Sequence, residues 1–407
     1  MSPVQTSSGP GPLAGVRVAD FSRVLAGPYA TMLLGDLGAD VVKVERPGAG
    51  DDTRAWGPPW DADGRATYFE SVNRNKRSVT LDLRSEEGRA AARRLALASD
   101  VLVENFVPGT MERFGLGYEE LSRDHPGLVW CSITGFGRSE QARALPGYDL
   151  LVQAMGGLMS VTGPQPGTPT KVGVALVDVI TGLHATVGVL AALRHRERTG
   201  QGQRVDAALL ASLLSAMVNQ AGGYVAAGVV PGILGNAHPS IAPYEVYETA
   251  DRPMVVAVGN DGQFAAFADA LGVPGLAGDE RFATNASRVA HRHELNGLIA
   301  PLLRQRGGDA WWDELTPRGV PCGPVNDLAE AFGLAQRLGL DPVVEIPGGA
   351  RAQAAHQVAH PLRWSATPAT YRLPPPALGQ DTAAVLEQLS GVSPSSVAEA
   401  PDTGRGW

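Results

Sequence analysis

The sequence predicts an α/β fold, with an open parallel sheet in a large domain and a smaller α+β domain. Short apolar segments of strand length alternate with helical segments over the first 134 residues, which is typical of a parallel sheet covered by helices. A chain of 407 residues is long enough for two or three domains. Its apolar fraction of 44% supports a packed core, and its 50 Gly and 31 Pro residues together stay below the share typical of disordered chains.

The first 45 residues predict a βαβ unit. Val16 to Phe21 is apolar enough for a buried strand, and a helix is expected from Pro28 to about Leu37. Pro28 suits the first helical position, and Gly38 suits the left-handed residue that ends a helix. Asp40 to Glu45, with the sequence DVVKVE, predicts a second strand, so we expect a parallel pair with a right-handed crossover.

Further strands are expected at Ser78 to Leu83, Val101 to Glu104 and Leu128 to Thr134, each after a helical segment. Ser85, followed by two glutamates, is a typical N-cap for a helix that ends near Ser99. The alternation continues, so the large domain should hold an open Rossmann-like sheet. Its ligand crevice is expected at the carboxyl ends of the strands.

The middle of the chain predicts a change of architecture. Leu183 to Arg198 and Ala207 to Gly228 have Ala- and Leu-rich helical patterns, with a short strand at Arg204 to Asp206 between them. Glu245 to Ala250 and Met254 to Gly259 then predict the hairpin of a smaller α+β unit. Helices of this unit are expected at Gln263 to Leu271, His293 to Arg306 and Asp309 to Leu315.

These patterns set the expected domain boundaries. The first segment is a flexible leader, the last has a disorder-like composition, and the chain leaves the large domain once and returns to it. The expected ranges are 1–12 for the leader, 13–229 for the first part of the large domain, 230–335 for the small domain, 336–391 for the returning segment and 392–407 for the tail.

Composition excludes several classes of function. A net charge of −8 opposes binding to a phosphate backbone, so no nucleic-acid partner is expected. Cys131 and Cys322 are the only cysteines, which leaves no material for a disulfide framework or a multi-cysteine metal site and fits a reducing, cytoplasmic setting. The longest apolar stretch, Ala207 to Val218, is too short to cross a bilayer, so no membrane partner is expected.

The first loop and the second strand bear on nucleotide binding. The segment from Phe21 to Pro28 has one glycine, so the G-x-G-x-x-G cradle of a dinucleotide enzyme is missing, and the chain has no P-loop motif either. Arg46 follows the second strand, where an arginine accommodates a ribose phosphate, which suggests NADP or coenzyme A. The alternative is a surface ion pair between Arg46 and Asp51 or Asp52, and the sequence leaves both open.

Asp178 is the most informative acid. An apolar run brings this carboxylate to the expected start of a long helix, where the dipole and free N–H groups favour the ionised form. An ordinary N-cap is the simpler explanation from the sequence alone, and Tyr148 and Asp149 are similarly ambiguous. Cys322 suits a small buried residue, and His291 and His293 lack the spacing of metal ligands on a helix, so no metal is expected.

Several separated blocks make the chain resemble the class III CoA-transferases, the family that includes formyl-CoA transferase, carnitine CoA-transferase and α-methylacyl-CoA racemase. The likeness extends from about Leu13 to Leu389. The blocks are residues 13–20, 26–28, 34–40, 43–48, 75–78, 103–106, 147–149, 157–159, 199–203 and 322–324.

The resemblance implies transfer of CoA from an acyl-CoA to a free carboxylate, with Asp178 as a nucleophile of low pKa that forms an anhydride and then an aspartyl-CoA thioester. It implies no permanently bound cofactor, because the CoA thioester is a substrate, and it implies a homodimer of interlocked protomers. Tyr148 and Asp149 would lie beside the nucleophile. The residues matching the family's CoA site are Leu25, Ala26, Arg46, Leu81, Arg84, Asn105, Phe106 and Arg113.

Two departures from the family pattern narrow this expectation. His238 to Pro243 replaces the tetraglycine loop of formyl-CoA transferase, and Tyr148 stands where the racemases have a histidine. Three alternatives stay: racemase activity, against which the tyrosine argues, a CoA-binding protein without catalysis, against which Asp178 argues, and an NADP enzyme, against which the missing glycine motif argues. Residues 23–28, 48–59 and 238–242 are most similar to dicarboxylate CoA-transferases of the succinyl-CoA:glutarate type. We therefore expect succinyl-CoA as donor and a dicarboxylate as acceptor, with an unidentified arginine for the second carboxylate.

Overall fold

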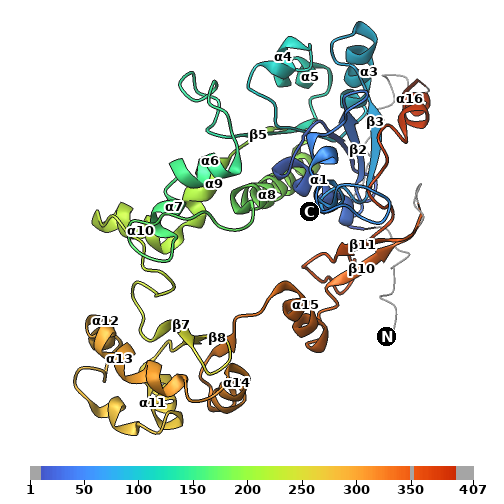
Figure 1. Cartoon of the computed structure of the whole chain (residues 1–407). Coiled ribbons are helices and arrows are strands. Elements are labelled where there is room, and N and C mark those ends of the chain that lie inside the picture. Colours follow the sequence, from blue (N-terminus) through green and yellow to red (C-terminus); the bar gives the residue numbers. More distant parts are fainter. Residues whose placement is uncertain (1–10, 349–352, 391–407) are drawn as a thin grey trace, which may run out of the picture. The chain divides into compact units, whose positions relative to one another are not determined.

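The computed structural model describes residues 11–348 and 353–390 (Figure 1). These residues form two compact units. The first unit takes its described residues from Met1–Gly156, Gly173–Gly222 and Asp341–Trp407, and the second from Gly157–Val172 and Gly223–Leu340. The division differs from the expected boundaries in residues 157–172, 223–229 and 336–340, which all join the smaller unit. The expected tail and most of the expected leader lie outside the described residues.

A six-stranded parallel sheet forms the centre of the first unit, which confirms the predicted α/β class. Its strand order is β3-β2-β1-β4-β5-β6, so the chain reverses direction across the sheet between β1 and β4. Ligands bind such sheets at this point, outside the carboxyl ends of the strands. The strands are β1 (Arg17–Asp20), β2 (Asp40–Glu45), β3 (Lys76–Thr80), β4 (Val101–Glu104), β5 (Val129–Thr134) and β6 (Arg204–Ala208).

Helices cover both faces of this sheet (Figure 1). Along β1, Ala19 packs with Leu95 of α3 in one core, whereas Asp20 faces α1 and accepts a hydrogen bond of 2.7 Å from Thr31 Oγ1. The helices of the first unit are α1 (Ala26–Asp36), α2 (Thr67–Glu70), α3 (Glu86–Leu97), α4 (Thr110–Arg113), α5 (Tyr118–Asp124), α6 (Asp149–Met155), α8 (Leu176–Thr199), α9 (Leu209–Ala216) and α16 (Thr382–Ser390).

Several predicted starts are wrong by two residues, among them those of α1 and β3. Helix α1 begins at Ala26, so Pro28 is its third residue and not its first. The position tolerates proline because the first N–H groups of a helix have no intrahelical acceptor. Strand β3 begins at Lys76, and this start was missed because lysine is usually a surface residue. Here Lys76 is buried and donates to Asp20, to the Pro28 carbonyl and to Asn73.

Helix α8 begins at Leu176, seven residues before the predicted start, and so includes Asp178. By length and composition it is long and apolar enough to cross a membrane, and α9 together with α10 (Val218–Ala227) passes only as a pair bent by 86°. Core helices pass the same test, and α8 packs against α1, β5 and β6. The predicted helix from Ala207 to Gly228 is interrupted at Met217 between α9 and α10.

The C-terminal segment packs against the edge strand β3. The backbone N–H of Asp381 donates to the Ser78 carbonyl at 2.9 Å, and the N–H of Thr80 donates to Thr382 Oγ1 at 3.0 Å. Val385 and Leu389 of α16 are buried in the core beneath α3. Before it, β10 (Val343–Ile346) and β11 (Ala355–Val358) form an antiparallel pair.

The second unit has its own sheet and core. The predicted hairpin is present as β7 (Tyr244–Glu248) and β8 (Pro253–Ala257), and β9 (Cys322–Pro324) joins it as a third antiparallel strand. The helices of this unit are α7 (Leu158–Val161), α11 (Asp261–Ala270), α12 (Asn285–Ala290), α13 (Arg292–Leu303), α14 (Gly308–Leu315) and α15 (Leu328–Arg337). Three of them, α11, α13 and α14, pack on the sheet around Phe264, Ile299 and Trp311.

Candidate active site

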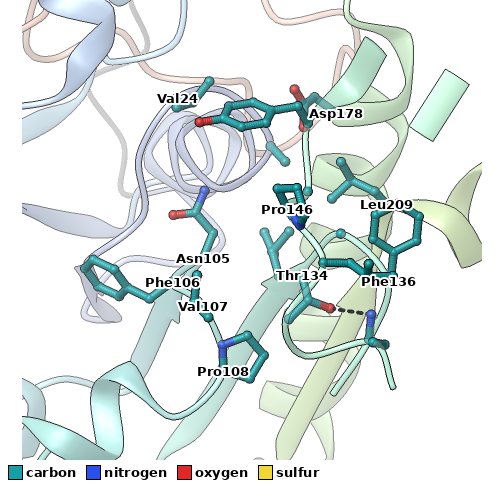
Figure 2. Close-up of a pocket in the computed structure, with 18 of the residues that line it drawn as sticks. Val24, Asn105, Phe106, Val107, Pro108, Thr134, Phe136, Pro146, Asp178 and Leu209 are labelled. Atoms are coloured by element: carbon teal, nitrogen blue, oxygen red, sulfur yellow. Dashed lines mark hydrogen bonds between the residues drawn. The ribbon is translucent and has the colours of Figure 1, made fainter. Parts of the chain in front are cut away.

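A hollow of about 240 Å³ lies at the carboxyl ends of β1, β4 and β5, where the strand order reverses (Figure 2). It brings together six of the residues that the sequence predicted for the site: Leu25, Ala26, Asn105, Phe106, Tyr148 and Asp178. The full lining is residues 23–26, 105–108, 133–137, 142–143, 145–148, 178 and 209.

Asn105 fixes the first loop of the hollow. Its Oδ1 accepts the Arg23 N–H at 2.9 Å, and its Nδ2 donates to the Arg23 carbonyl at 2.7 Å. The next residue, Val24, has a φ of 69°, which is a strained conformation for a β-branched side chain. The Val24 N–H points to the Asp51 carboxylate, with both oxygens at 3.3 Å. The loop is therefore held on both sides, and Figure 2 shows Val24 and Asn105 at the hollow.

A buried ion pair between Lys43 and Asp51 contacts the loop that contains Val24. Lys43 donates to Asp51 at 2.8 Å and to the Ser22 carbonyl at 2.9 Å, and the side chains of Lys43 and Asp51 are fully buried. Burial alone would raise the pKa of Asp51, but the charge of Lys43 and the hydrogen bonds to the carboxylate lower it to about 2. Burial lowers the pKa of Lys76 to about 8, against the opposing charge of Asp20. Sequence patterns missed this network, because its lysines interrupt the apolar pattern of their strands.

Asp178 is the third residue of α8, but it does not cap the helix. The N-cap is Ala175, and the capping carboxylate comes from Asp149 of α6. Asp149 Oδ1 accepts the N–H of Val177 at 2.8 Å and that of Asp178 at 3.3 Å, while its Oδ2 accepts Gln153 Nε2 at 2.6 Å. The Asp178 carboxylate is therefore not used as a helix cap, and Asp178 lines the hollow.

Burial, together with the nearby Asp149 carboxylate, raises the pKa of Asp178 to about 7. The expectation of a low pKa is therefore wrong. The N–H groups at the start of α8 bind Asp149, so they stabilise that carboxylate instead. A carboxylate with a pKa near the ambient pH is more basic than an ordinary aspartate and is still ionised in a large fraction of molecules, as suits a nucleophile or base.

Tyr148 is placed by a close approach of two glycines. A Cβ atom on Gly135 would lie 2.4 Å from the Gly147 Cα, so both positions need glycine for the segment before α6 to rest on the end of β5. Tyr148 follows Gly147, lines the hollow and is 63% exposed. Asp149 lies behind it at the start of α6 and does not belong to the lining.

A second, larger hollow of about 600 Å³ shares Arg23 and Phe106 with the first. It contains three more predicted residues, Arg46, Leu81 and Arg84. Its lining is residues 21, 23, 44–47, 49, 81–84, 106 and 114. Both hollows therefore meet at the side chains of Arg23 and Phe106, which lie 5.6 Å apart from guanidinium carbon to ring centre.

Arg46 also forms the surface pair that the sequence left open. Its Nη2 lies 2.7 Å from Asp52 Oδ1, and its Nε donates to the Gly50 carbonyl. Asp51, the other acid considered, is taken by Lys43. Arg113 is absent from the linings of both hollows and donates to Thr110 Oγ1 at 2.9 Å.

Sequence reasoning missed four residues of this region: Arg23, Arg143, Gln153 and Lys43. Arg23 and Arg143 line the first hollow. Their positions shortly before Leu25 and Tyr148 in the sequence could have pointed to them. Within residues 11–348 and 353–390, no group of three or more His, Cys, Asp or Glu side chains is placed to hold a metal ion. Burial raises the pKa of Cys131 to about 12 and also raises that of Cys322, so neither thiol is an activated nucleophile.

Comparisons with known proteins show the family of the chain. The chain matches CoA-transferase family III over residues 13–382. It is 44% identical over 394 residues to a succinate–glutarate CoA-transferase of Agrobacterium fabrum, covering 94% of this chain and 96% of that protein. It is 41% identical over 388 residues to the succinyl-CoA:glutarate CoA-transferase of Mus musculus, covering 93% and 86%.

Solved structures give the same result. A CaiB/BaiF family protein from Brucella suis is 42% identical and superposes with a TM-score of 0.83, covering 94% of this chain and all of that one. The family predicted from the sequence blocks is therefore confirmed. The chain belongs to CoA-transferase family III and is a CoA-transferase enzyme.

Proposed function

We propose that the enzyme moves CoA from succinyl-CoA to a dicarboxylic acid through a covalent intermediate on Asp178. The observation that carries the proposal is the position of Asp178: it is the one carboxylate in the lining of the first hollow, and its pKa is raised to about 7. The relatives named for succinyl-CoA and glutarate support the choice of substrates. Those relatives are transferases, and Tyr148 replaces the histidine of the racemases, so we favour transfer over racemisation.

The first half of the reaction loads CoA onto the enzyme. An Asp178 carboxylate oxygen attacks the thioester carbonyl of succinyl-CoA, the C–S bond breaks, and CoA leaves as a thiolate. This forms a mixed anhydride between succinate and Asp178. The thiolate then attacks the aspartyl carbonyl, which releases succinate and leaves an Asp178–CoA thioester.

The second half runs the same steps in reverse. A carboxylate of the acceptor attacks the aspartyl thioester, the CoA thiolate leaves, and an anhydride forms between Asp178 and the acceptor. The thiolate attacks the acceptor carbonyl, which yields the new acyl-CoA and regenerates the Asp178 carboxylate. No net oxidation occurs, and no other co-reactant is needed.

Trapping the intermediate tests this mechanism. We expect Asp178→Ala to lower turnover by on the order of 1,000-fold or more while CoA still binds, because the nucleophile is lost and the CoA contacts stay. Hydroxylamine added with succinyl-CoA should convert Asp178 of the wild type to a hydroxamate, identified by peptide mass spectrometry. Substantial turnover by the alanine variant, or an unmodified Asp178, would refute the assignment.

We propose that the second hollow binds the adenosine end of CoA, with Arg46 at the ribose 3′-phosphate. Arg46 follows β2, where doubly wound sheets meet an adenosine ribose, and Arg84 lies on the same lining. The phosphate would take the place of Asp52, whose ion pair with Arg46 is solvent-exposed and therefore weak. A charge-assisted hydrogen bond of about 1.5–3 kcal/mol corresponds to roughly 10- to 100-fold in affinity.

Calorimetry with CoA and dephospho-CoA tests the Arg46 assignment. Wild type should prefer CoA, and Arg46→Ala should bind both ligands equally. The KM for succinyl-CoA should rise with little change in kcat, because the phosphate is remote from the thioester. An unchanged preference for CoA would leave Arg46 as the partner of Asp52 only.

We propose further that the enzyme is a homodimer. Apolar side chains of α6, α8 and α9 are exposed on the first unit, and these helices contact one another. Exposed apolar surface of this kind marks interaction sites. The side chains are Leu150, Met155, Leu183, Val187 and Leu214. Light scattering at micromolar concentration should give twice the mass of the 42.5 kDa chain, and a monomer would exclude this assembly.

A further inference from the structure

We propose that Arg143 binds the distal carboxylate of the dicarboxylic substrate and so determines the preference for dicarboxylates. This inference rests on the proposed function. It starts from the charges of the first hollow: its lining contains three charged side chains, Asp178, Arg23 and Arg143. If one substrate carboxyl reacts at Asp178, the distal carboxylate needs one of the two arginines.

Arg23 has an ion-pair partner and an aromatic partner in this structure, although its Nε is buried without a hydrogen-bond partner among the described residues. Its Nη1 lies 3.3 Å from Asp52 Oδ2, and its guanidinium stacks on Phe106. Its backbone is held on both sides by Asn105. Arg23 also lines the second hollow, where the phosphates of CoA are expected. The Arg23 guanidinium therefore lies where the two hollows meet, and we assign its charge to the CoA phosphates.

Arg143 lies on the loop between β5 and α6, and in the described part of the chain its guanidinium has no such partners. Among the residues that the structure describes, no carboxylate lies within 4 Å of its guanidinium nitrogens. The guanidinium rests against Gly109 at the start of α4, where a Cβ atom would lie 3.3 Å from Nη2. Gly109 has a φ of 92°, a backbone conformation that favours glycine. Because glycine has no Cβ atom, it also leaves space for the Arg143 guanidinium. Arg143 thus lines the hollow and has a set of side-chain donors that the described residues leave unused.

The chemistry of a guanidinium suits this role. Its planar N–H groups bind a carboxylate through two parallel hydrogen bonds, which a lysine cannot reproduce. The acceptor approaches Asp178 when this residue is an uncharged thioester, so the nearby negative charge is that of Asp149. Arg143 supplies an attraction that only an acid with a second carboxylate can use. The succinyl group of the donor has the same distal carboxylate, so Arg143 should act in both halves of the reaction.

Paired acceptors of equal chain length provide the test. Glutarate and pentanoate differ by the distal carboxylate, and transfer from succinyl-CoA to each is measured at saturating donor. We expect Arg143→Ala to lower kcat/KM for glutarate roughly 10- to 100-fold through KM, with pentanoate unchanged. Arg143→Lys should recover part of the loss, because the charge stays while the paired hydrogen bonds are lost.

A charge-reversing variant sharpens the test. Arg143→Glu should prefer 5-aminopentanoate, which has an ammonium group at the position of the distal carboxylate, over glutarate. Arg198→Ala is the matched control, because it removes the same charge from an exposed position at the end of α8, outside the linings of both hollows. This control should keep the acceptor preference of the wild type.

The outcomes separate this inference from the proposed function. If Arg143→Ala transfers CoA to glutarate as well as the wild type does, Arg143 is not the carboxylate site, while the transferase proposal stands. Equal losses for glutarate and pentanoate would show a structural role and overturn the inference as well. If the wild type transfers CoA to none of the tested acids, both proposals are wrong.

Discussion

Asp51 and Asp178 are two aspartates of the same unit, and their surroundings are opposite. Asp51 faces Lys43 at 2.8 Å, accepts the Thr53 N–H at 3.0 Å, and its pKa is lowered to about 2. Asp178 is partly buried beside Asp149, and burial with that neighbour raises its pKa to about 7. Asp51 therefore favours the folded state when ionised, whereas the ionised form of Asp178 opposes it.

This difference separates a carboxylate that holds structure from one that is available for chemistry. The partners of Asp51 satisfy its charge and hold the loop that carries Val24. The N–H groups that could have satisfied Asp178 bind Asp149 instead. Functional carboxylates are commonly found in surroundings of the second kind, where the pKa is shifted towards neutrality. The comparison predicts opposite effects when each charge is removed.

The largest effect is expected for Asp51→Asn. It leaves Lys43 buried without its partner, and breaking a buried ion pair in this way costs about 3–5 kcal/mol. The free energy of unfolding at pH 7, from urea denaturation at one protein concentration, should fall by this amount. The pKa of Asp51 is depressed, so its contribution is complete above about pH 4, the ordinary pKa of aspartate, and is lost as the pH falls towards 2.

Asp52 provides the matched control for that variant. It is the next residue, and its ion pairs with Arg46 and Arg23 are solvent-exposed. Asp52→Asn should change the free energy of unfolding by no more than about 1 kcal/mol. Similar losses for both variants would mean that burial does not distinguish the two acids.

Asp178→Asn should have the opposite sign. The pKa of Asp178 in the folded state, about 7, lies above its ordinary value of 3.8, so the folded state loses stability as the pH rises between these values. At 1.4 kcal/mol for each pKa unit, the cost reaches roughly 4 kcal/mol above pH 7. The asparagine variant should therefore be inactive but more stable at pH 8, with a smaller gain at pH 5. A gain that does not vary with pH would contradict this account.

The regular strands were the most predictable part of the fold. β2 and β4 match their predicted bounds because three apolar residues in each mark a short strand that ends in a glutamate. Asp178 was expected at a helix start, but the helical pattern was predicted to begin only at Leu183, because residues 176–182 are rich in β-branched side chains, which disfavour helix. The helix forms there through tertiary contacts: Asp149 caps it from another segment, and Gly182 lets it approach α1 closely, since a Cβ would lie 2.7 Å from the Ala26 carbonyl oxygen.

The site was predictable in its residues and not in its electrostatics. Nine of the eleven site residues expected from the family resemblance line at least one of the two hollows, because they belong to short segments at strand ends. The family blocks carried no information on which carboxylate uses the N–H groups of α8. That choice depends on the meeting of residues 149 and 178 in space, so the expected low pKa of Asp178 was wrong. Gln153 escaped notice for the same reason, since its role depends on its contact with Asp149.

The smallest expected effect, and the one that tests this comparison most directly, comes from Asp149→Asn. The asparagine Oδ1 can still accept the N–H groups of Val177 and Asp178, and rotation of the Gln153 amide can present an oxygen to the new NH₂ group. The cap is thus kept and the charge is lost. Because that charge raises the pKa of Asp178, the acidic limb of the profile of kcat/KM against pH should move to lower pH, with little change in kcat/KM at pH 8. Asp149→Glu keeps the charge and should leave the limb near its wild-type position. A limb that stays in place in the asparagine variant, or moves to higher pH, would show that Asp149 acts on Asp178 only through the backbone of α8.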